Sequence, residues 1–247
     1  MNSKAKGLTQ ELLLATQILA SEGVIDGFGH VSVRNPDRIG NYFMLHDNCG
    51  LNIEDGQVIE LDRESNPINP DGPRPSIERF IHGEIYRLRP DVGAVVHTHA
   101  PPFIPFGVST TPLQPLYHMC GFMNGGVPVF DIAKEHGMTN MLITEHKFGR
   151  SLASALDQSA LVLMRGHGAT VVGASIKEAV FRAVYATVNA QLQFVAIQLG
   201  NPKYLTDEEA VKADELHQLV FDRPWDYWMK KSTKNRRSKV CQSKNQP

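Results

Sequence analysis

The chain has few cysteines and no long apolar run, and these two features exclude several classes of protein. Three cysteines (Cys49, Cys120 and Cys241) stand far apart among 247 residues, so we expect free thiols rather than a disulfide framework or a cysteine metal motif. No stretch approaches the roughly 18 apolar residues of a transmembrane helix. Glutamine and glutamate interrupt the apolar N-terminal segment, which predicts an amphipathic helix rather than a signal peptide. We therefore expect a cytoplasmic protein with no membrane partner.

Acidic residues are absent from the C-terminal segment. Residues 230–247 carry seven basic side chains and no acidic one, although the whole chain has a net charge of −1. This segment lacks apolar periodicity and is predicted to be a disordered tail. Basic runs attract phosphate, but the rest of the chain shows no nucleic-acid motif, so no nucleic-acid partner is expected. The remaining length suits one core, which predicts a single domain over residues 1–229.

The order of predicted elements indicates an α/β domain. Apolar spacing predicts helices over 8–22, 139–156, 175–200 and 206–220, and one after the proline-rich loop 63–76 with Ser76 as its N-cap. Strands are predicted at 29–35, on both sides of the turn-rich stretch 47–56, at 93–99, near 126–130, and as a hairpin over 160–173. Strands of the first half follow one another without helices between them. The sheet is therefore expected to be mixed and largely antiparallel.

Three histidines lie in settings that suit metal ligands. His97 and His99 end the apolar run GAVVHTHA, and side chains two residues apart in a strand share one face. His167 lies between two glycines in RGHGAT, where the backbone can turn sharply. Three neutral imidazoles around an open position suit a catalytic Zn, Mn or Fe ion. The alternative is that these histidines only pack at strand ends.

Further polar residues accompany the three histidines. Glu78 follows the proline-rich loop, and a carboxylate near three imidazoles can be a fourth ligand or an acid/base group. Tyr117 and His118 lie together in LYHM. His82 lies one turn after Glu78 and either supports the site or packs in the core.

These motifs resemble the class II aldolase/adducin family. The stretches GHVSVRNP, RPSIERFIHGEIYRLRPDVGAVVHTHAP and RGHGATVVG follow in the order and spacing of that family across most of residues 8–200. The resemblance implies a three-layer α/β/α domain with a metal ion held by His97, His99 and His167. It also implies that Glu78 serves as an acid/base group and in some members as a ligand. Family members are often tetramers in which one subunit supplies groups to the site of its neighbour.

Departures from the sugar-phosphate aldolases point to another branch. His30 replaces an asparagine, and Ile77 replaces the second serine of a phosphate-binding Ser-Ser-Glu motif. An isoleucine side chain cannot donate a hydrogen bond, which argues against a phosphorylated substrate. His118 stands where these aldolases tend to place an acid tyrosine, with Tyr117 just before it. Together the changes resemble the decarboxylase-like members.

The resemblance predicts a lyase that decarboxylates a hydroxylated carboxylic acid, including catechol-type aromatic acids. A divalent metal ion (Zn, Mn, Fe or Co) stabilises the enolate-like carbanion in such chemistry, and His118 is preferred over Glu78 as the proton donor. Tyr117 is the third candidate catalytic group. Candidate substrate-binding residues are His30, Ser76, Arg79 and Arg165.

Three other functions stay open. A retro-aldolase acting on an unphosphorylated hydroxy acid or sugar acid would release an aldehyde instead of CO2, and a non-haem iron oxygenase would consume oxygen. A non-catalytic adducin-like scaffold would not need three histidines and Glu78. Five apolar residues either line a substrate pocket or, as we expect for most of them, pack in the core: Ile77, Phe80, Phe103, Phe106 and Met119.

Overall fold

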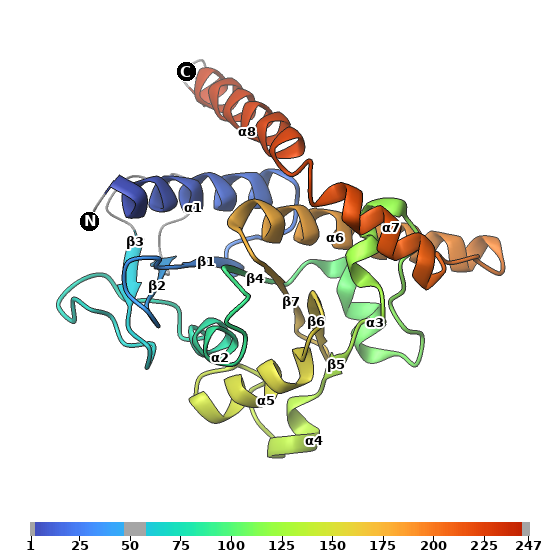
Figure 1. Ribbon diagram of the computed structural model, residues 1–247, viewed down its shortest axis with the longest axis horizontal. Helices are drawn as coiled ribbons and strands as arrows, with labels where there is room; N and C mark the ends of the chain where they lie inside the picture. Colours follow the sequence, from blue (N-terminus) through green and yellow to red (C-terminus); the bar gives the residue numbers. More distant parts are fainter. Residues whose placement is uncertain (1–2, 47–57, 244–247) are drawn as a thin grey trace.

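Seven strands form one sheet in the computed structural model, which describes residues 3–46 and 58–243 (Figure 1). The strands are β1 (His30–Arg34), β2 (Tyr42–Leu45), β3 (Val58–Leu61), β4 (Ala94–Thr98), β5 (Val129–Phe130), β6 (Leu161–Met164) and β7 (Gly168–Gly173). Their order is β3-β2-β1-β4-β7-β6-β5, and β5 and β6 pair in parallel while the other neighbours are antiparallel. This confirms the mixed sheet, while the turn-rich stretch 47–56 lies outside the described residues.

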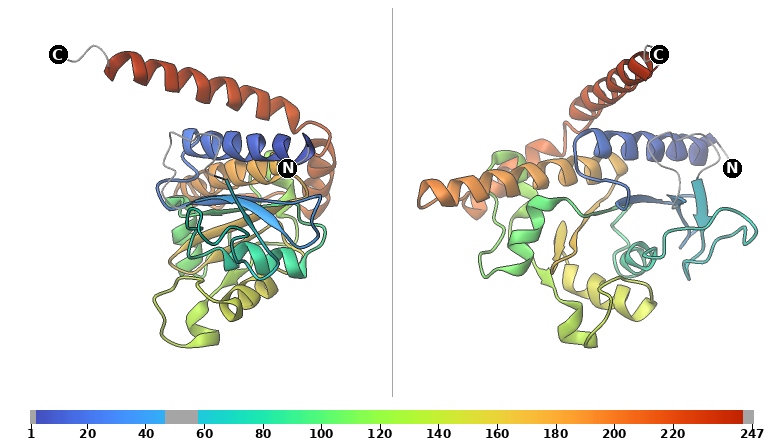
Figure 2. Two further views of the ribbon diagram at one scale, coloured as in Figure 1. Left: turned by 90° about the vertical axis from the view of Figure 1, so that its left-hand side faces the viewer. Right: turned by 180° about the vertical axis from the view of Figure 1, so that it is seen from behind.

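Helices cover both faces of the sheet (Figure 2). One face packs against α1 (Ser3–Ser21) and α6 (Ile176–Leu199), and the other against α2 (Phe80–Leu88) and α5 (His146–Leu156). The shorter elements are η1 (Pro101–Phe103), α3 (Ile104–Val108), η2 (His118–Met123) and α4 (Ile132–His136). Helices α7 (Asp207–His217) and α8 (Asp222–Ser243) follow α6. The predicted three-layer α/β/α architecture is confirmed.

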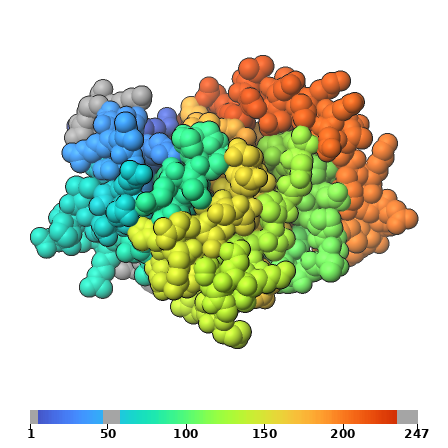
Figure 3. Space-filling view, turned by 60° about the horizontal axis from the view of Figure 1, so that its bottom comes forward, coloured from blue at the N-terminus to red at the C-terminus, as the bar shows by residue number. Residues whose placement is uncertain are grey.

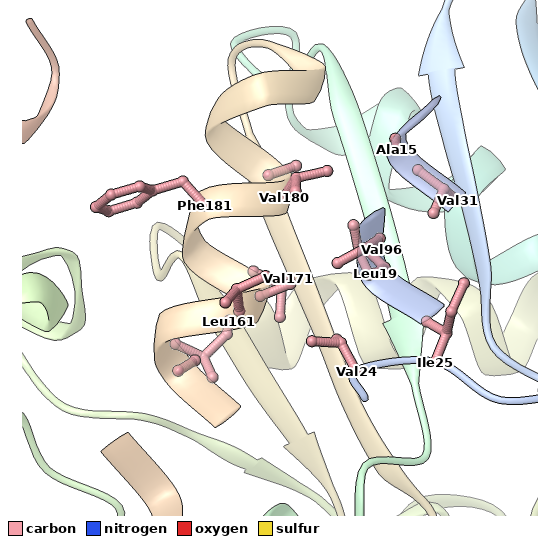
Figure 4. Packing of buried hydrophobic residues seen from close by; sticks show 14 of the residues in the cluster. Ala15, Leu19, Val24, Ile25, Val31, Val96, Leu161, Val171, Val180 and Phe181 are labelled. Atoms are coloured by element: carbon pink, nitrogen blue, oxygen red, sulfur yellow. The ribbon is translucent and has the colours of Figure 1, made fainter. Parts of the chain in front are cut away.

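Strand β4 is buried on both faces and divides two apolar cores. Val96 packs in the core under α1 and α6, whereas its neighbour Val95 packs in the core under α2 and α5. Figure 4 shows Val96 and Val171 of the sheet together with Leu19 of α1 and Val180 of α6. Burial of this apolar surface stabilises the fold by about 25 cal/mol per Å². A strand buried on both sides gives its terminal residues a fixed position.

The start of α2 differs from the sequence prediction. Ser76 does not cap this helix, because the N-cap residue is Arg79 and no side chain caps it. Instead the Ser76 hydroxyl accepts a hydrogen bond from the Glu78 N–H at 3.2 Å, and the Arg79 N–H donates to the Ser76 carbonyl. Glu78 therefore lies in a turn before the helix. By contrast Thr206 caps α7 in a capping box, at the start of the helix predicted over 206–220.

The predicted helix over 139–156 is confirmed only from His146 onward. The preceding residues form turns because the side chains of Thr139 and Asn140 accept hydrogen bonds from the N–H groups of Met141 and Leu142. Met141 adopts a φ of 69°, which no helix accommodates. In Figure 3 the segment from α4 to α5 lies between the chain around residues 60–90 and the chain around 100–125. This irregular segment contributes to the site described below.

Helix α8 extends into residues 230–243 of the segment that the sequence predicts to be a disordered tail. Helix α8 runs to Ser243, with buried Trp225 and Trp228 near its start (Figures 1 and 2). Burial of both indole rings holds the first turns of this helix. Within the described residues, no helix combines the length and apolarity that a bilayer crossing needs.

Candidate metal centre

Three imidazoles and one carboxylate converge at the end of β4. The Nε2 atom of His99 lies 2.9 Å from that of His97 and 3.0 Å from that of His167. The Oε2 atom of Glu78 lies 3.7 Å from His97 Nε2 and 3.6 Å from His167 Nε2. One ligand atom from each of the four residues falls within 4.8 Å of all the others. The structure thus brings together the three predicted ligands and the predicted carboxylate.

Strand pairing places His167 beside the other two histidines. Strand β7 pairs with β4 so that Thr98 faces Ala169 and His97 faces Thr170. The β6–β7 turn carries His167, and the register brings this turn to the end of β4. Gly168 is required here, because a Cβ atom at this position would collide with the carbonyl group of Thr98. Gly168 therefore permits a close approach, and Gly166, with a φ of 66°, forms the sharp turn that the sequence indicated.

Glu78 is held by the turn that precedes α2 and by the segment before α5. Its Oε1 atom accepts a hydrogen bond of 2.9 Å from the Ile143 N–H, and its Oε2 atom faces the histidines. The Ser76 hydroxyl fixes the Glu78 backbone from the other side. Sequence analysis missed Ile143, because a backbone donor in an irregular segment leaves no residue signature.

Contacts at the far ring nitrogens of two of the histidines orient their Nε2 atoms toward the cluster. The Nδ1 atom of His167 lies 3.1 Å from the Met141 carbonyl oxygen, which can only accept, so Nδ1 carries the proton. The Nε2 atom of His167 is then a lone-pair ligand. The Nδ1 atom of His97 lies 3.4 Å from the Thr170 hydroxyl. Such partners commonly fix the tautomer of metal-binding histidines.

The donor set fits a small divalent ion. A tetrahedral ion with ligands at about 2.0–2.1 Å places its ligand atoms about 3.3 Å apart. The separations of 2.9 to 3.7 Å among the closest pairs of ligand atoms bracket this value. Histidine nitrogen with one carboxylate oxygen suits Zn, Mn, Fe or Co, so the residues alone do not select among these metals.

Protonation states also suit metal binding. Burial lowers the pKa of His97 well below its ordinary value, and the neighbouring histidines lower it further. Burial and the charge of His167 lower the pKa of His99. Burial by itself would raise the pKa of Glu78, but the neighbouring His167 and the Ile143 N–H, which donates to Oε1, lower it by more, so the pKa is lowered. Neutral imidazoles and an ionised carboxylate are the forms that bind metals.

A buried chain of polar groups leads away from the centre through His30. The Nδ1 atom of His30 lies 2.7 Å from His82 Nε2, and His82 Nδ1 lies 2.6 Å from the Ser32 hydroxyl. Ser32 in turn contacts the Tyr86 hydroxyl at 2.7 Å. The His30 ring lies 5.0 Å from the His97 ring, and its Nε2 atom has no hydrogen-bond partner among the described residues. His82 is fully buried and contacts His30, so both roles predicted for it, support of the site and packing in the core, stay predictions.

The two predicted arginines are already engaged by other groups. The Arg79 guanidinium donates to the carbonyl oxygens of Ser65 and Ser76, which ties it to the loop before α2. Arg165 pairs with Asp131 at 2.8 Å near the protein surface. Phe103 and Phe106, offered as pocket residues or core, are buried in the core, whereas Ile77 is exposed.

Tyr117 and His118 are not part of the four-residue cluster. His118 starts η2 and is exposed, with its ring 5.6 Å from that of His217. Tyr117 just precedes η2, and its N–H donates to the Asn189 side chain of α6. The buried Asn189 side chain also accepts from the Leu116 N–H and donates to the Gln114 carbonyl oxygen. It therefore fixes the backbone that leads to His118. Within one chain, the described residues do not bring His118 into this cluster.

Comparison with known proteins identifies the family of this chain. The model of the class II aldolase and adducin N-terminal domain matches residues 10–194. The chain belongs to the class II aldolase and adducin family. Members of this class of aldolase are metal-dependent, and the His/Glu cluster is the possible metal site of this chain.

Individual relatives of this family member include decarboxylases. The decarboxylase tropJ of Talaromyces stipitatus is 35% identical over 254 residues, covering 93% of this chain and 96% of the relative. The 3,4-dihydroxyphthalate decarboxylase of Arthrobacter keyseri is 28% identical over 227 residues, covering 85% of this chain and 87% of the relative. A crystal structure of an aldolase II superfamily protein from Pseudomonas syringae shares the fold, with a TM-score of 0.79, 18% identity and 95% of each chain covered. The class II aldolase-like chain is therefore a lyase.

Proposed function

We propose that this family member decarboxylates a hydroxylated aromatic carboxylic acid of the catechol type, using a divalent Zn, Mn, Fe or Co ion. The observation that carries this proposal is the convergence of His97, His99, His167 and Glu78 within 4.8 Å. The likeness to two decarboxylases supports decarboxylation over aldol cleavage. The retro-aldolase and the iron oxygenase are the alternatives that the test below separates.

The proposed chemistry divides between the metal ion and the protein. When bound, a divalent ion supplies a Lewis acid for adjacent substrate oxygens. The three histidines would hold that ion, because their Nε2 atoms converge on one point. Breaking the bond to the carboxyl carbon releases CO2 and leaves an electron pair on the ring carbon, which then needs a proton. Glu78 faces the centre as a carboxylate, so its Oε2 is positioned to take the proton of a substrate hydroxyl and to return it to that ring carbon.

His118 is the other proposed proton donor, and it would act from a neighbouring subunit. Its exposed position on η2 leaves it available to another chain. Exposed apolar side chains on and after α6 and α7, which include Leu199, Leu216 and Leu219, support association into the homotetramer that we propose for this protein. Tyr117, adjacent to His118, is proposed to assist it.

Substrate binding is proposed for four residues with different contacts. His30 lies against the His97 ring, and its Nε2 atom has no hydrogen-bond partner in the part of the chain that the structure describes, so it is the preferred group to contact substrate. Ser76 and Arg79 shape the turn that carries Glu78, and Arg165 would have to leave Asp131 to hold a carboxylate. Ile77 is 53% exposed and offers no hydrogen-bond donor, which supports a substrate without phosphate.

The first test is product analysis on metal-loaded protein. The enzyme is incubated with 3,4-dihydroxyphthalate and dihydroxybenzoates, and CO2, aldehyde and oxygen are followed together. We expect CO2 release, and expect Glu78→Gln to keep the metal while losing at least about 100-fold in rate. Glu208→Gln, at an exposed position on α7, is the matched control. Aldehyde release would favour the retro-aldolase, and oxygen consumption would favour the oxygenase.

Mixing two variants tests the shared site. His118→Phe should slow turnover strongly if this residue donates the proton. If Glu78 and His118 of different subunits form one site, co-refolded Glu78→Gln and His118→Phe chains should regain part of the activity. A His118→Phe enzyme with normal rate would assign the proton to Glu78 or Tyr117.

A further inference from the structure

Phe28 lies beside the metal centre with most of its side chain exposed. Its ring centroid is 6.3 Å from that of His99, at an interplanar angle of 40°, and 74% of the residue is exposed. Single exposed apolar residues are common on protein surfaces and need no explanation. Phe28 differs because its neighbour, His99, belongs to the His/Glu cluster of the candidate metal centre. Sequence analysis missed it, since nothing in GFGH marks a phenylalanine as exposed.

The loop that carries Phe28 is fixed against β4. The Phe28 N–H donates a hydrogen bond of 2.9 Å to the Asp26 side chain. A Cβ atom at Gly29 would collide with the Ile25 side chain and lie 3.2 Å from the carbonyl oxygen of His97. Glycine at this position therefore lets the loop pack directly on the strand that carries His97. The position of Phe28 beside the centre is set by the backbone, while its ring contributes little to the core.

We propose that Phe28 is a stacking platform for the aromatic ring of the substrate, an inference that rests on the proposed function. A ring whose adjacent oxygens reach the centre must extend outward from the imidazoles, and the exposed Phe28 ring flanks one of them. Aromatic rings pack favourably in offset or tilted arrangements with centroids about 4.5–7 Å apart. An aliphatic hydroxy acid or a sugar acid has no ring face to stack in this way. Phe28 is thus a specificity residue rather than a catalytic one.

A second apolar neighbour agrees with this substrate class. Ile77 directly precedes Glu78 and is also exposed, so two residues of the centre, His99 and Glu78, each have an exposed apolar side chain beside them. Burying exposed apolar side chains against an apolar ligand removes apolar surface from water, which favours binding of that ligand. Neither side chain can donate a hydrogen bond to a phosphate or to a polyhydroxylated chain.

Two chelators with the same metal-binding group test the platform without turnover. Benzohydroxamate and acetohydroxamate differ in that one carries a phenyl ring and the other a methyl group. Their affinities for the zinc-loaded protein are measured by calorimetry for wild type, Phe28→Ala and Phe28→Trp. Phe28→Ala should weaken benzohydroxamate about tenfold and change acetohydroxamate less than about twofold. Phe28→Trp should retain the preference for the ring.

The matched control is Phe194→Ala, which removes a half-exposed phenylalanine from α6 and should leave both affinities unchanged. Equal losses for both chelators in Phe28→Ala would assign the residue to support of the metal centre and overturn the platform. Unchanged affinities, or a change of molecular mass that marks Phe28 as a subunit contact, would overturn it as well. A chain that binds no zinc would overturn the platform and the proposed function together.

The platform and the proposed function can fail separately. Ring-dependent chelator binding without CO2 release would keep the platform and remove decarboxylation. CO2 release, with affinities for both chelators that do not change in Phe28→Ala, would keep decarboxylation and remove the platform.

Discussion

His167 Nε2 lies 3.0 Å from His99 Nε2, although 68 positions separate the two residues in the chain. The antiparallel register of β4 and β7 creates this contact, because it pairs Thr98 with Ala169. The β6–β7 turn, which carries His167, then lies next to His99. The cluster therefore depends on strand pairing as much as on the identity of its residues. Substitutions in the pairing should affect metal binding as directly as substitutions of the ligands.

Replacing a ligand should release the metal ion. His99→Ala removes the imidazole that lies closest to both other histidines, so we expect metal affinity to fall at least about 100-fold. Metal content after dialysis, measured by elemental analysis, checks this. His136→Ala, which removes a histidine bonded to Ser151 outside the cluster, should retain the metal. A full complement of metal in His99→Ala would remove this residue from the site.

Gly168→Ala should weaken both folding and metal binding. The added Cβ atom would collide with the Thr98 carbonyl group, and the β4–β7 ladder must shift to accommodate it. We expect a loss of about 1–3 kcal/mol in the free energy of unfolding, together with weaker metal binding. Urea unfolding and metal titration measure the two effects. Gly7→Ala is the control, since a Cβ atom there meets nothing within 4 Å and alanine favours a helix.

The His-x-His pair, the glycine-flanked His167 and the layered fold could be predicted from the sequence because each has a local pattern. Strand alternation places His97 and His99 on one side, and a turn needs its glycines. The partner groups could not be predicted. Ile143 contributes a backbone N–H and Met141 a carbonyl oxygen, and any residue type supplies these.

The position of Ser76 shows a second limit of sequence analysis. A serine before an apolar helical pattern is a typical N-cap, yet here it stabilises a turn that presents Glu78. The turn forms because the chain must bring Glu78 to Ile143 and the histidines, and tertiary contacts of this kind override local preference. The exposure of His118 likewise depends on how η2 packs against α7, which has no local signature.

Ser32→Ala should destabilise the fold through the buried chain at His82. The substitution leaves His82 Nδ1 and the Tyr86 hydroxyl without their shared partner in a dry environment. Leaving buried polar groups unpaired costs about 1–3 kcal/mol, which urea unfolding can measure. Ser109→Ala, at an exposed position, is the control and should change the free energy of unfolding by less than about 0.5 kcal/mol. Equal stability of Ser32→Ala and wild type would mean that the hydrogen bonds of Ser32 with His82 and Tyr86 contribute nothing to the free energy of unfolding.

Acidification should destabilise the metal-free protein, because burial lowers the pKa of His30 to about 4 against an ordinary value of 6.5. Between these values the unfolded chain binds the proton and the folded chain does not, so the free energy of unfolding falls as the pH falls. Burial lowers the pKa of His82 and His97 in the same direction. Each such histidine contributes a slope of up to about 1.4 kcal/mol per pH unit.

Urea unfolding of chelator-treated protein at several pH values between about 4 and 6.5 measures this slope. His30→Asn should reduce the slope relative to wild type, because one of the buried histidines no longer binds a proton on unfolding. The lowered pKa of Glu78 adds stability that is present above its ordinary value of 4.5 and is lost only as the pH falls below it. Its contribution therefore appears at the acid end of the range. A flat profile down to pH 4 would show that these histidines are protonated alike in the folded and unfolded chains.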